Sequence, residues 1–132
     1  MKIISIFILL ILITSSTLAE EVLTVGIYRN IKVRKAVFSY QGSDYELVGN
    51  DSIPIQLISK DDKVEIVRRS NGVQLVQGEV IIGTYQKVNF YKTTPESVFR
   101  IQTTSPSTKR RIYYGSLEIK VINDIFTFIN HV

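Results

Sequence analysis

The sequence predicts an all-β domain of many short antiparallel strands behind an N-terminal export segment. Short runs rich in β-branched and aromatic residues recur along the chain, separated by glycine, proline, asparagine, aspartate and serine. Beyond the apolar start, no stretch keeps the 3.6-residue period of an amphipathic helix. We expect a curled sheet, a sandwich or a partly closed barrel, because the pattern of so many short strands is compatible with all three.

The first 19 residues have the three parts of a secretory signal peptide. Lys2 supplies the positive start, an apolar run extends from Ile3 to Ile13, and the small residues Thr17 and Ala19 precede the cut. We place cleavage after Ala19, which leaves residues 20–132 as a single β domain. The alternative is an uncleaved membrane anchor, but the run is shorter than the roughly 20 apolar residues that span a bilayer.

Charge and cysteine content narrow the class of protein. The net charge of the chain is +4, and removal of Lys2 with the signal peptide lowers it to +3. This mild excess suits an anionic cell-surface polymer and falls well short of a nucleic-acid binder. The chain has no cysteine, so it is neither a disulfide-stapled extracellular module nor a lipid-anchored lipoprotein. We expect a soluble, exported protein, attached to the membrane only if the signal segment stays uncleaved.

Turn residues bound each expected strand. In the first half the strands are Val22–Tyr28, Lys35–Tyr40, Tyr45–Val48 and Ile55–Ile58, with a hairpin turn at residues 41–44. Lys63–Arg69 and Val73–Gln77 follow, joined by Ser70-Asn71-Gly72, because Asn and Gly tolerate the positive φ of a tight hairpin. The second half contains Glu79–Gly83, Lys87–Lys92, Ser97–Gln102, a loop at Thr103–Lys109, and a closing hairpin of Arg110–Asn123 with Phe126–Asn130.

Residue types that catalysis would need are scarce. The one histidine, His131, is the penultimate residue, where chains commonly fray, so we expect no catalytic base there. Without cysteine and with one histidine, a zinc site of the Cys/His type cannot be built. Carboxylates such as Asp61 and Asp62 lie in expected turns or on polar strand faces, the usual place for solvated charges. We therefore expect no catalytic residue, no metal and no cofactor, with a glycan-cutting carboxylate pair as the rival interpretation.

A basic and aromatic cluster is the strongest candidate for a binding site. Arg110, Arg111, Tyr113 and Tyr114 are close together beside the expected loop. A tyrosine ring can stack on a pyranose, and a guanidinium can hold a carboxylate through two hydrogen bonds. The competing interpretation is an amphipathic strand that places Ile112 and one tyrosine in the core.

Several motifs resemble the N-terminal part of the SpoIID/LytB domain of bacterial sporulation and cell-wall proteins. The opening LTVGIYRN is similar to the I-x-V-G-L strand that follows the signal peptide in that family. Near the end, FRI and YYGSLEI precede FTFINHV, similar to a Y-R-G-x-L-x-[IV] strand followed by one ending in [VI]-N-x-V. Tyr114 stands where the family pattern favours arginine.

The resemblance implies work on peptidoglycan. Complete members are similar to lytic transglycosylases or enhance wall amidases, and their catalytic glutamate lies in a helical segment after the N-x-V strand. The sequence stops before that segment, so the resemblance carries over no catalytic residue and implies either a fragment or a free-standing module. We expect a non-catalytic, exported domain that binds peptidoglycan or another wall glycan. The alternatives are a secreted β-sandwich adhesin and an amidase enhancer that acts through a protein partner such as a wall hydrolase.

The last expected strand, Phe126–Asn130, has a structural consequence of its own. Nothing in the sequence after it would cover its free edge or its aromatic side chains. We therefore expect unpaired backbone groups there, and aggregation or dependence on a partner in the isolated chain.

Overall fold

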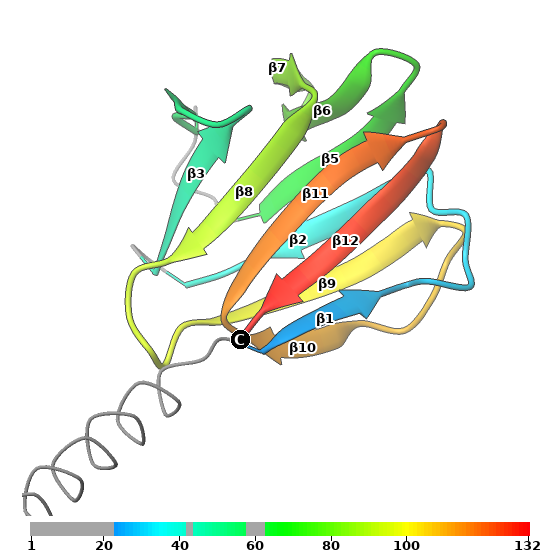
Figure 1. The fold of residues 1–132 in the computed structure, drawn as a ribbon. Coiled ribbons are helices and arrows are strands. Elements are labelled where there is room, and N and C mark those ends of the chain that lie inside the picture. The colour runs from blue at the N-terminus through cyan, green and yellow to red at the C-terminus, as the bar shows by residue number, and fades with distance from the viewer. Residues whose placement is uncertain (1–22, 42–43, 58–62) are drawn as a thin grey trace, which may run out of the picture.

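Two antiparallel sheets of six strands pack face to face in the computed structural model, which describes residues 23–41, 44–57 and 63–132 (Figure 1). Sheet A contains, in spatial order, β1 (Thr24–Ile27), β12 (Ile125–His131), β11 (Ser116–Ile122), β8 (Lys87–Lys92), β3 (Tyr45–Gly49) and β4 (Ile53–Pro54). Sheet B contains β10 (Arg111–Tyr114), β9 (Val98–Ser105), β2 (Lys35–Ser39), β5 (Lys63–Arg69), β6 (Gly72–Gln77) and β7 (Val80–Tyr85). The all-β prediction is confirmed, and among its three forms the sandwich is the one observed.

The predicted signal peptide, residues 1–19, and its cleavage site after Ala19 lie outside the described residues. Within the ranges that the structure does describe, no helix has the length and apolar character needed to cross a membrane.

The chain passes between the sheets six times, so strands that are neighbours in sequence often belong to different layers. Between β7 and β8 a single residue, Gln86, makes the passage. Its backbone N–H donates to the side-chain oxygen of Asn50 at 2.9 Å, and the N–H of Asn50 donates to the carbonyl of Lys87 at 2.7 Å. These bonds satisfy backbone groups that a bend between sheets would otherwise leave unpaired.

Alternation along each strand fills the space between the sheets with aromatic and branched side chains. At the centre, the Phe38 ring of β2 stacks on the Phe90 ring of β8 with centroids 3.9 Å apart, and the Phe99 ring of β9 lies 5.2 Å from Phe38. All three side chains are fully buried. Because Phe38 and Phe90 belong to opposite sheets, their contact ties the two layers together.

The hairpin predicted at residues 41–44 is wrong. The strands on either side, β2 and β3, belong to different sheets, and β2 pairs with β5 and β9 instead. Phe38 and Tyr45 face each other across the sandwich, edge to face, with ring centroids 5.5 Å apart. A hairpin would have placed both rings in one sheet, so burial of both in the shared core favours the passage between layers.

The predicted single strand Arg110–Asn123 is in fact two strands in different sheets. Gly115 separates β10 from β11 with a φ of +95°, a conformation that side chains with a Cβ rarely adopt. A Cβ at this position would lie 2.3 Å from the carbonyl oxygen of His131. The rest of the closing hairpin is confirmed, since β11 and β12 pair along their whole length around Asn123 and Asp124, both with positive φ.

Other differences from the prediction are smaller. The strand expected at Ile55–Ile58 is replaced by the two-residue β4, with Ile58 outside the described residues. The expected loop Thr103–Lys109 begins late, because β9 continues to Ser105.

The last strand has no free edge. β12 lies between β1 and β11 and forms a ladder with each, so the unpaired backbone groups expected there are absent from this strand. Its aromatic side chains Phe126 and Phe128 point into the core and are buried. β12 has this second neighbour because β1, at the start of the described chain, pairs with it. The two strands are far apart in the sequence, so local patterns do not reveal their contact.

Candidate functional site

The strand β10 divides the four predicted contact residues between two environments. It forms the edge of sheet B and pairs with β9, so its side chains alternate between the sandwich interior and the outer face. Tyr113 pairs with buried Phe99, whereas Ile112 pairs with Arg100 on the outer face. Arg111 and Tyr113 therefore point toward the interior, and Tyr114 points outward.

Arg111 and Tyr113 contact the buried aromatic rings of Tyr28 and Phe99. The Arg111 guanidinium carbon lies 4.4 Å from the centre of the Tyr28 ring, and its Nη1 donates to the Tyr113 hydroxyl at 3.4 Å. The Tyr113 ring is 5.6 Å from that of Phe99. Burial raises the pKa of Tyr28 while the positive charge of Arg111 opposes the rise. Tyr113 is thus half-buried and packed, as the competing interpretation expected for one tyrosine, whereas Arg111 is exposed and only its guanidinium lies on the Tyr28 ring. The other half of that interpretation is wrong, because Ile112 is exposed.

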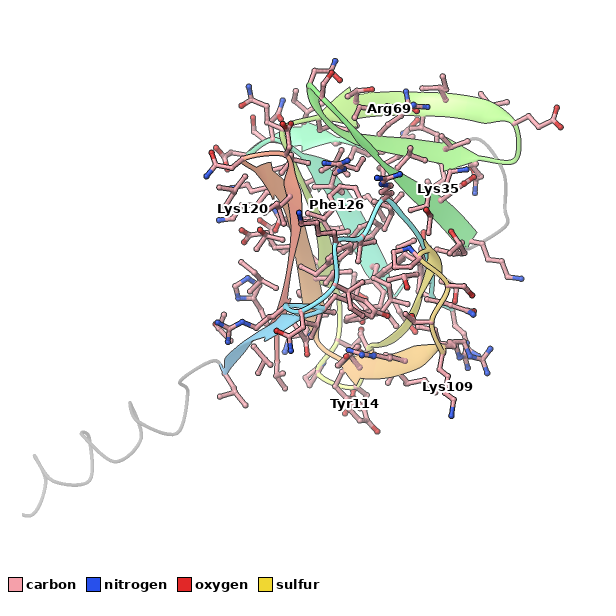
Figure 2. All side chains as sticks on the ribbon, turned by 90° about the vertical axis from the view of Figure 1, so that its right-hand side faces the viewer. Lys35, Arg69, Lys109, Tyr114, Lys120 and Phe126 are labelled. Carbon is pink, nitrogen blue, oxygen red and sulfur yellow. The ribbon has the colours of Figure 1, made fainter. Side chains whose placement is uncertain are left out.

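Tyr114 and Ile112 instead project from the outer face of sheet B. Tyr114 is 62% exposed and Ile112 is 58% exposed. In Figure 2, Tyr114 extends away from the ribbon at one end of β10, and Lys109 lies on the segment before the strand's other end. The strand ladders place Ile112 beside Arg100 of β9, and Arg100 beside Ser39 of β2.

A shallow basic hollow lies next to these side chains. It is lined by Val37, Ser39, Lys63, Arg100, Ile101, Gln102 and Arg110. Ser39 pairs with both Arg100 and Lys63, which brings these two cations to neighbouring strands of one face. Arg110, immediately before β10, completes the set. We call Lys63, Arg100 and Arg110 the basic face.

Two residues of the basic face, Arg100 and Arg110, carry positive charge that no described residue neutralises. Within the described residues, the guanidinium groups of Arg100 and Arg110 make no hydrogen bond or ion pair. Glu65, on the same face, is already paired with Lys35 at 3.0 Å. Two unpaired guanidinium groups around one hollow are suited to a carboxylate or phosphate, which each can hold through a charge-assisted hydrogen bond.

His131 is not the frayed terminal residue that the sequence suggested. It is the last residue of β12, and its Nε2 lies 3.3 Å from Oε2 of Glu118. Its Nδ1 lies 3.4 Å from the Thr24 hydroxyl. Both contacts are on the outer face of sheet A, away from the basic face. Among the described residues, no group of three histidine, cysteine or acidic side chains is placed to hold a metal ion.

Sequence reasoning missed Arg100 and Lys63 as members of the site. The alternation in Val98–Ser105 does predict that Arg100 faces away from the core. Lys63 comes from β5, 37 residues earlier in the sequence (100 − 63), so only the sheet order brings it to the same face as Arg100 and Arg110. No protein-family model, curated protein or solved structure matches this chain.

Proposed function

We propose that this chain is an exported β domain of the SpoIID/LytB type that binds the peptidoglycan wall without catalysing a reaction. The observation that carries the proposal is one hollow lined by Arg100 and Arg110, whose guanidinium groups have no partner among the described residues, on the face of sheet B that also carries the exposed ring of Tyr114. The motifs of the opening and closing strands and the signal-peptide pattern of residues 1–19 support the wall as the location.

The chemistry of peptidoglycan suits such a surface. Its stem peptides carry carboxylates, which guanidinium groups recognise through paired hydrogen bonds. Its sugar rings present apolar faces against which Tyr114 can stack. The positive net charge of the chain adds a long-range attraction to an anionic polymer.

The proposal is tested by co-sedimentation with purified sacculi from which phosphate-containing polymers have been stripped. The chain is expressed without residues 1–19, a form that retains all twelve strands. We expect this protein to bind, and the double variant Arg100→Gln/Arg110→Gln to bind at least about tenfold more weakly, because each charged hydrogen bond contributes roughly 1.5–3 kcal/mol.

The matched control is Arg29→Gln/Arg69→Gln, which removes the same charge from exposed positions outside the basic face. This control should bind within about twofold of the parent protein, because nonspecific charge attraction is shared over the whole surface. Equal losses in the two double variants, or no binding by the parent, would overturn the proposal. Binding that requires an added wall amidase would favour the partner-dependent alternative instead.

A further inference from the structure

A second hollow lies on the outer face of sheet A, on the opposite side of the sandwich from the basic face. It is lined by Asn89, Tyr91, Lys92, Ser116, Glu118 and His131, and its volume is about 330 Å³. The ladders place Asn89 opposite Glu118, and Ser116 opposite His131, so these four side chains share one face of β8, β11 and β12. The volume lies at the lower end of the roughly 300–1,000 Å³ typical of small-molecule sites. We call this the polar hollow.

Asn89 is the feature that points to a ligand. Only 5% of this residue is exposed, yet its carboxamide has no hydrogen-bond partner in the described part of the chain. Every fully buried polar side-chain atom in the described residues has a hydrogen-bond partner. The unpaired carboxamide of Asn89 is therefore not fully buried, and it reaches solvent at the hollow that the residue lines. With no partner in the described protein, the donor and acceptor of this amide are left to water or to a ligand in the hollow, whereas side-chain amides with so little exposure are usually paired within the protein.

The other polar groups of the hollow are held in place. Glu118 lies 3.3 Å from Nε2 of His131 and 3.4 Å from the ammonium of Lys120. The hydroxyl oxygen of Ser116 accepts a 2.8 Å hydrogen bond from the backbone N–H of Lys92, so its own proton remains available to donate. Fixed polar groups bind a ligand with little loss of side-chain entropy.

Groups of both signs at the hollow favour a neutral ligand. Glu118 is its acidic residue and Lys92 its basic one, and Lys120 pairs with Glu118 at 3.4 Å from the same face of β11. Figure 2 shows Lys120 on the outer side of sheet A, with Phe126 on the inner side. An anion would meet the carboxylate of Glu118, and a cation would meet Lys120.

We propose that the polar hollow binds a single neutral pyranose ring. The carboxamide of Asn89 and the carboxylate of Glu118 are planar groups that can each bond to neighbouring hydroxyls of a sugar. Tyr91, 44% exposed at the rim, supplies an aromatic ring for the apolar face of the sugar. The site is separate from the basic face, so it adds a sugar-selective contact to the charge-dependent one.

The test is a nuclear magnetic resonance titration of the protein, expressed without residues 1–19, with N-acetylglucosamine and glucose. Glucuronate and glucosamine serve as anionic and cationic probes of similar shape. We expect the two neutral sugars to shift the amide resonances of Asn89, Glu118 and His131, with the charged sugars binding at least about tenfold more weakly because they oppose Glu118 or Lys120.

Two variants separate a binding role from a folding role. Asn89→Ala removes the unpaired carboxamide, and Tyr91→Ala removes an exposed ring that contributes little to the core. Each should weaken sugar binding at least about tenfold, whereas Arg100→Gln/Arg110→Gln should leave it unchanged. No shift at the polar hollow with neutral sugar, shifts at the basic face instead, or full binding by a folded Tyr91→Ala protein would overturn the inference. Since sacculus binding is measured with other variants, either proposal can fail alone.

Discussion

The hydroxyl of Tyr45 donates a 2.6 Å hydrogen bond to the carbonyl oxygen of Gly115. Tyr45 is the first residue of β3 in sheet A, and Gly115 is the residue at which the chain passes from sheet B to sheet A. The bond joins segments 70 residues apart and satisfies a carbonyl at an irregular point of the backbone. It therefore holds in place the turn that separates β10, with its outward-facing Tyr114, from β11.

Removing this hydroxyl tests the contact at neutral pH. We expect Tyr45→Phe to lower the free energy of unfolding by about 1–2 kcal/mol, since the Gly115 carbonyl loses its partner while the ring stays packed. Urea unfolding followed by circular dichroism measures the change. A variant as stable as the parent would show that the hydrogen bond does not stabilise the fold.

The same tyrosine predicts alkaline sensitivity. Burial, with a smaller effect of Asp44, raises the pKa of Tyr45 well above its usual value near 10. The folded state therefore keeps the phenolic proton where the unfolded chain releases it, and stability falls as the pH rises above about 10. We expect the parent to lose more stability than Tyr45→Phe between about pH 9 and pH 11. Urea unfolding at the two pH values measures this. An equal loss of stability in the parent and in Tyr45→Phe would contradict the prediction.

Gly115 allows a direct test of backbone strain. In Gly115→Ala the new Cβ would meet the His131 carbonyl at 2.3 Å, at a φ of +95°. We expect a loss of more than about 2 kcal/mol, since neither the turn nor the end of β12 can move freely. Gly78→Ala is the control: φ is +62° and nothing lies within 4 Å, so its cost should stay near 1 kcal/mol, roughly that of a left-handed alanine. Similar costs for both would argue against the close approach.

Among the substitutions considered, we expect the largest loss of stability from removal of an aromatic ring at the centre of the core. Phe38→Ala removes a fully buried ring that contacts Phe90 and Phe99, and we expect it to cost about 3–5 kcal/mol. Tyr114→Ala removes an exposed aromatic ring and should change stability by no more than about 0.5 kcal/mol. Thermal unfolding of both variants distinguishes core from surface. A large loss for Tyr114→Ala would show that this ring packs against the fold.

The turn between β11 and β12 offers a stabilising substitution. Asn123 and Asp124 have φ values of +51° and +61°, as in the two-residue hairpin turns that favour Asn-Gly. Asp124→Gly should therefore raise the free energy of unfolding by about 0.5 kcal/mol, by relieving the left-handed strain of a residue with a Cβ. The contact from Arg68 survives because it is made to the Asp124 carbonyl. A decrease in the midpoint of thermal unfolding would contradict this account.

Local patterns in the sequence predicted strands better than they predicted partners. The predicted hairpin of β5 and β6 is confirmed, but its turn differs from the prediction. Ser70 and Asn71 lie between the strands, Asn71 lacks the positive φ expected, and Gly72, at φ +139°, begins β6 opposite Arg69. The segment 41–44 has equally suitable turn residues, yet β2 and β3 lie in different sheets. Suitable turn residues allow the chain to reverse direction, but they do not determine whether the next strand joins the same sheet or the opposite one.

The same limit explains the candidate sites. Alternation predicts that Arg100 and Glu118 face away from the core, but their neighbours are fixed by sheet order. The cluster that looked continuous in the sequence, from Arg110 to Tyr114, is split by alternation between packing against Tyr28 and exposure on the basic face. His131 looked frayed because its partner strand β1 begins 107 residues earlier.

The most direct test of the wall-binding account is the salt dependence of binding to stripped sacculi. If Arg100 and Arg110 hold carboxylates, the affinity of the parent should fall steeply as salt rises, since exposed ion pairs are screened. The Arg100→Gln/Arg110→Gln protein should bind weakly and lose most of that dependence, while Arg29→Gln/Arg69→Gln should keep it. Parent binding that does not respond to salt, or the same salt dependence in the Arg100→Gln/Arg110→Gln protein, would contradict the assignment of the basic face.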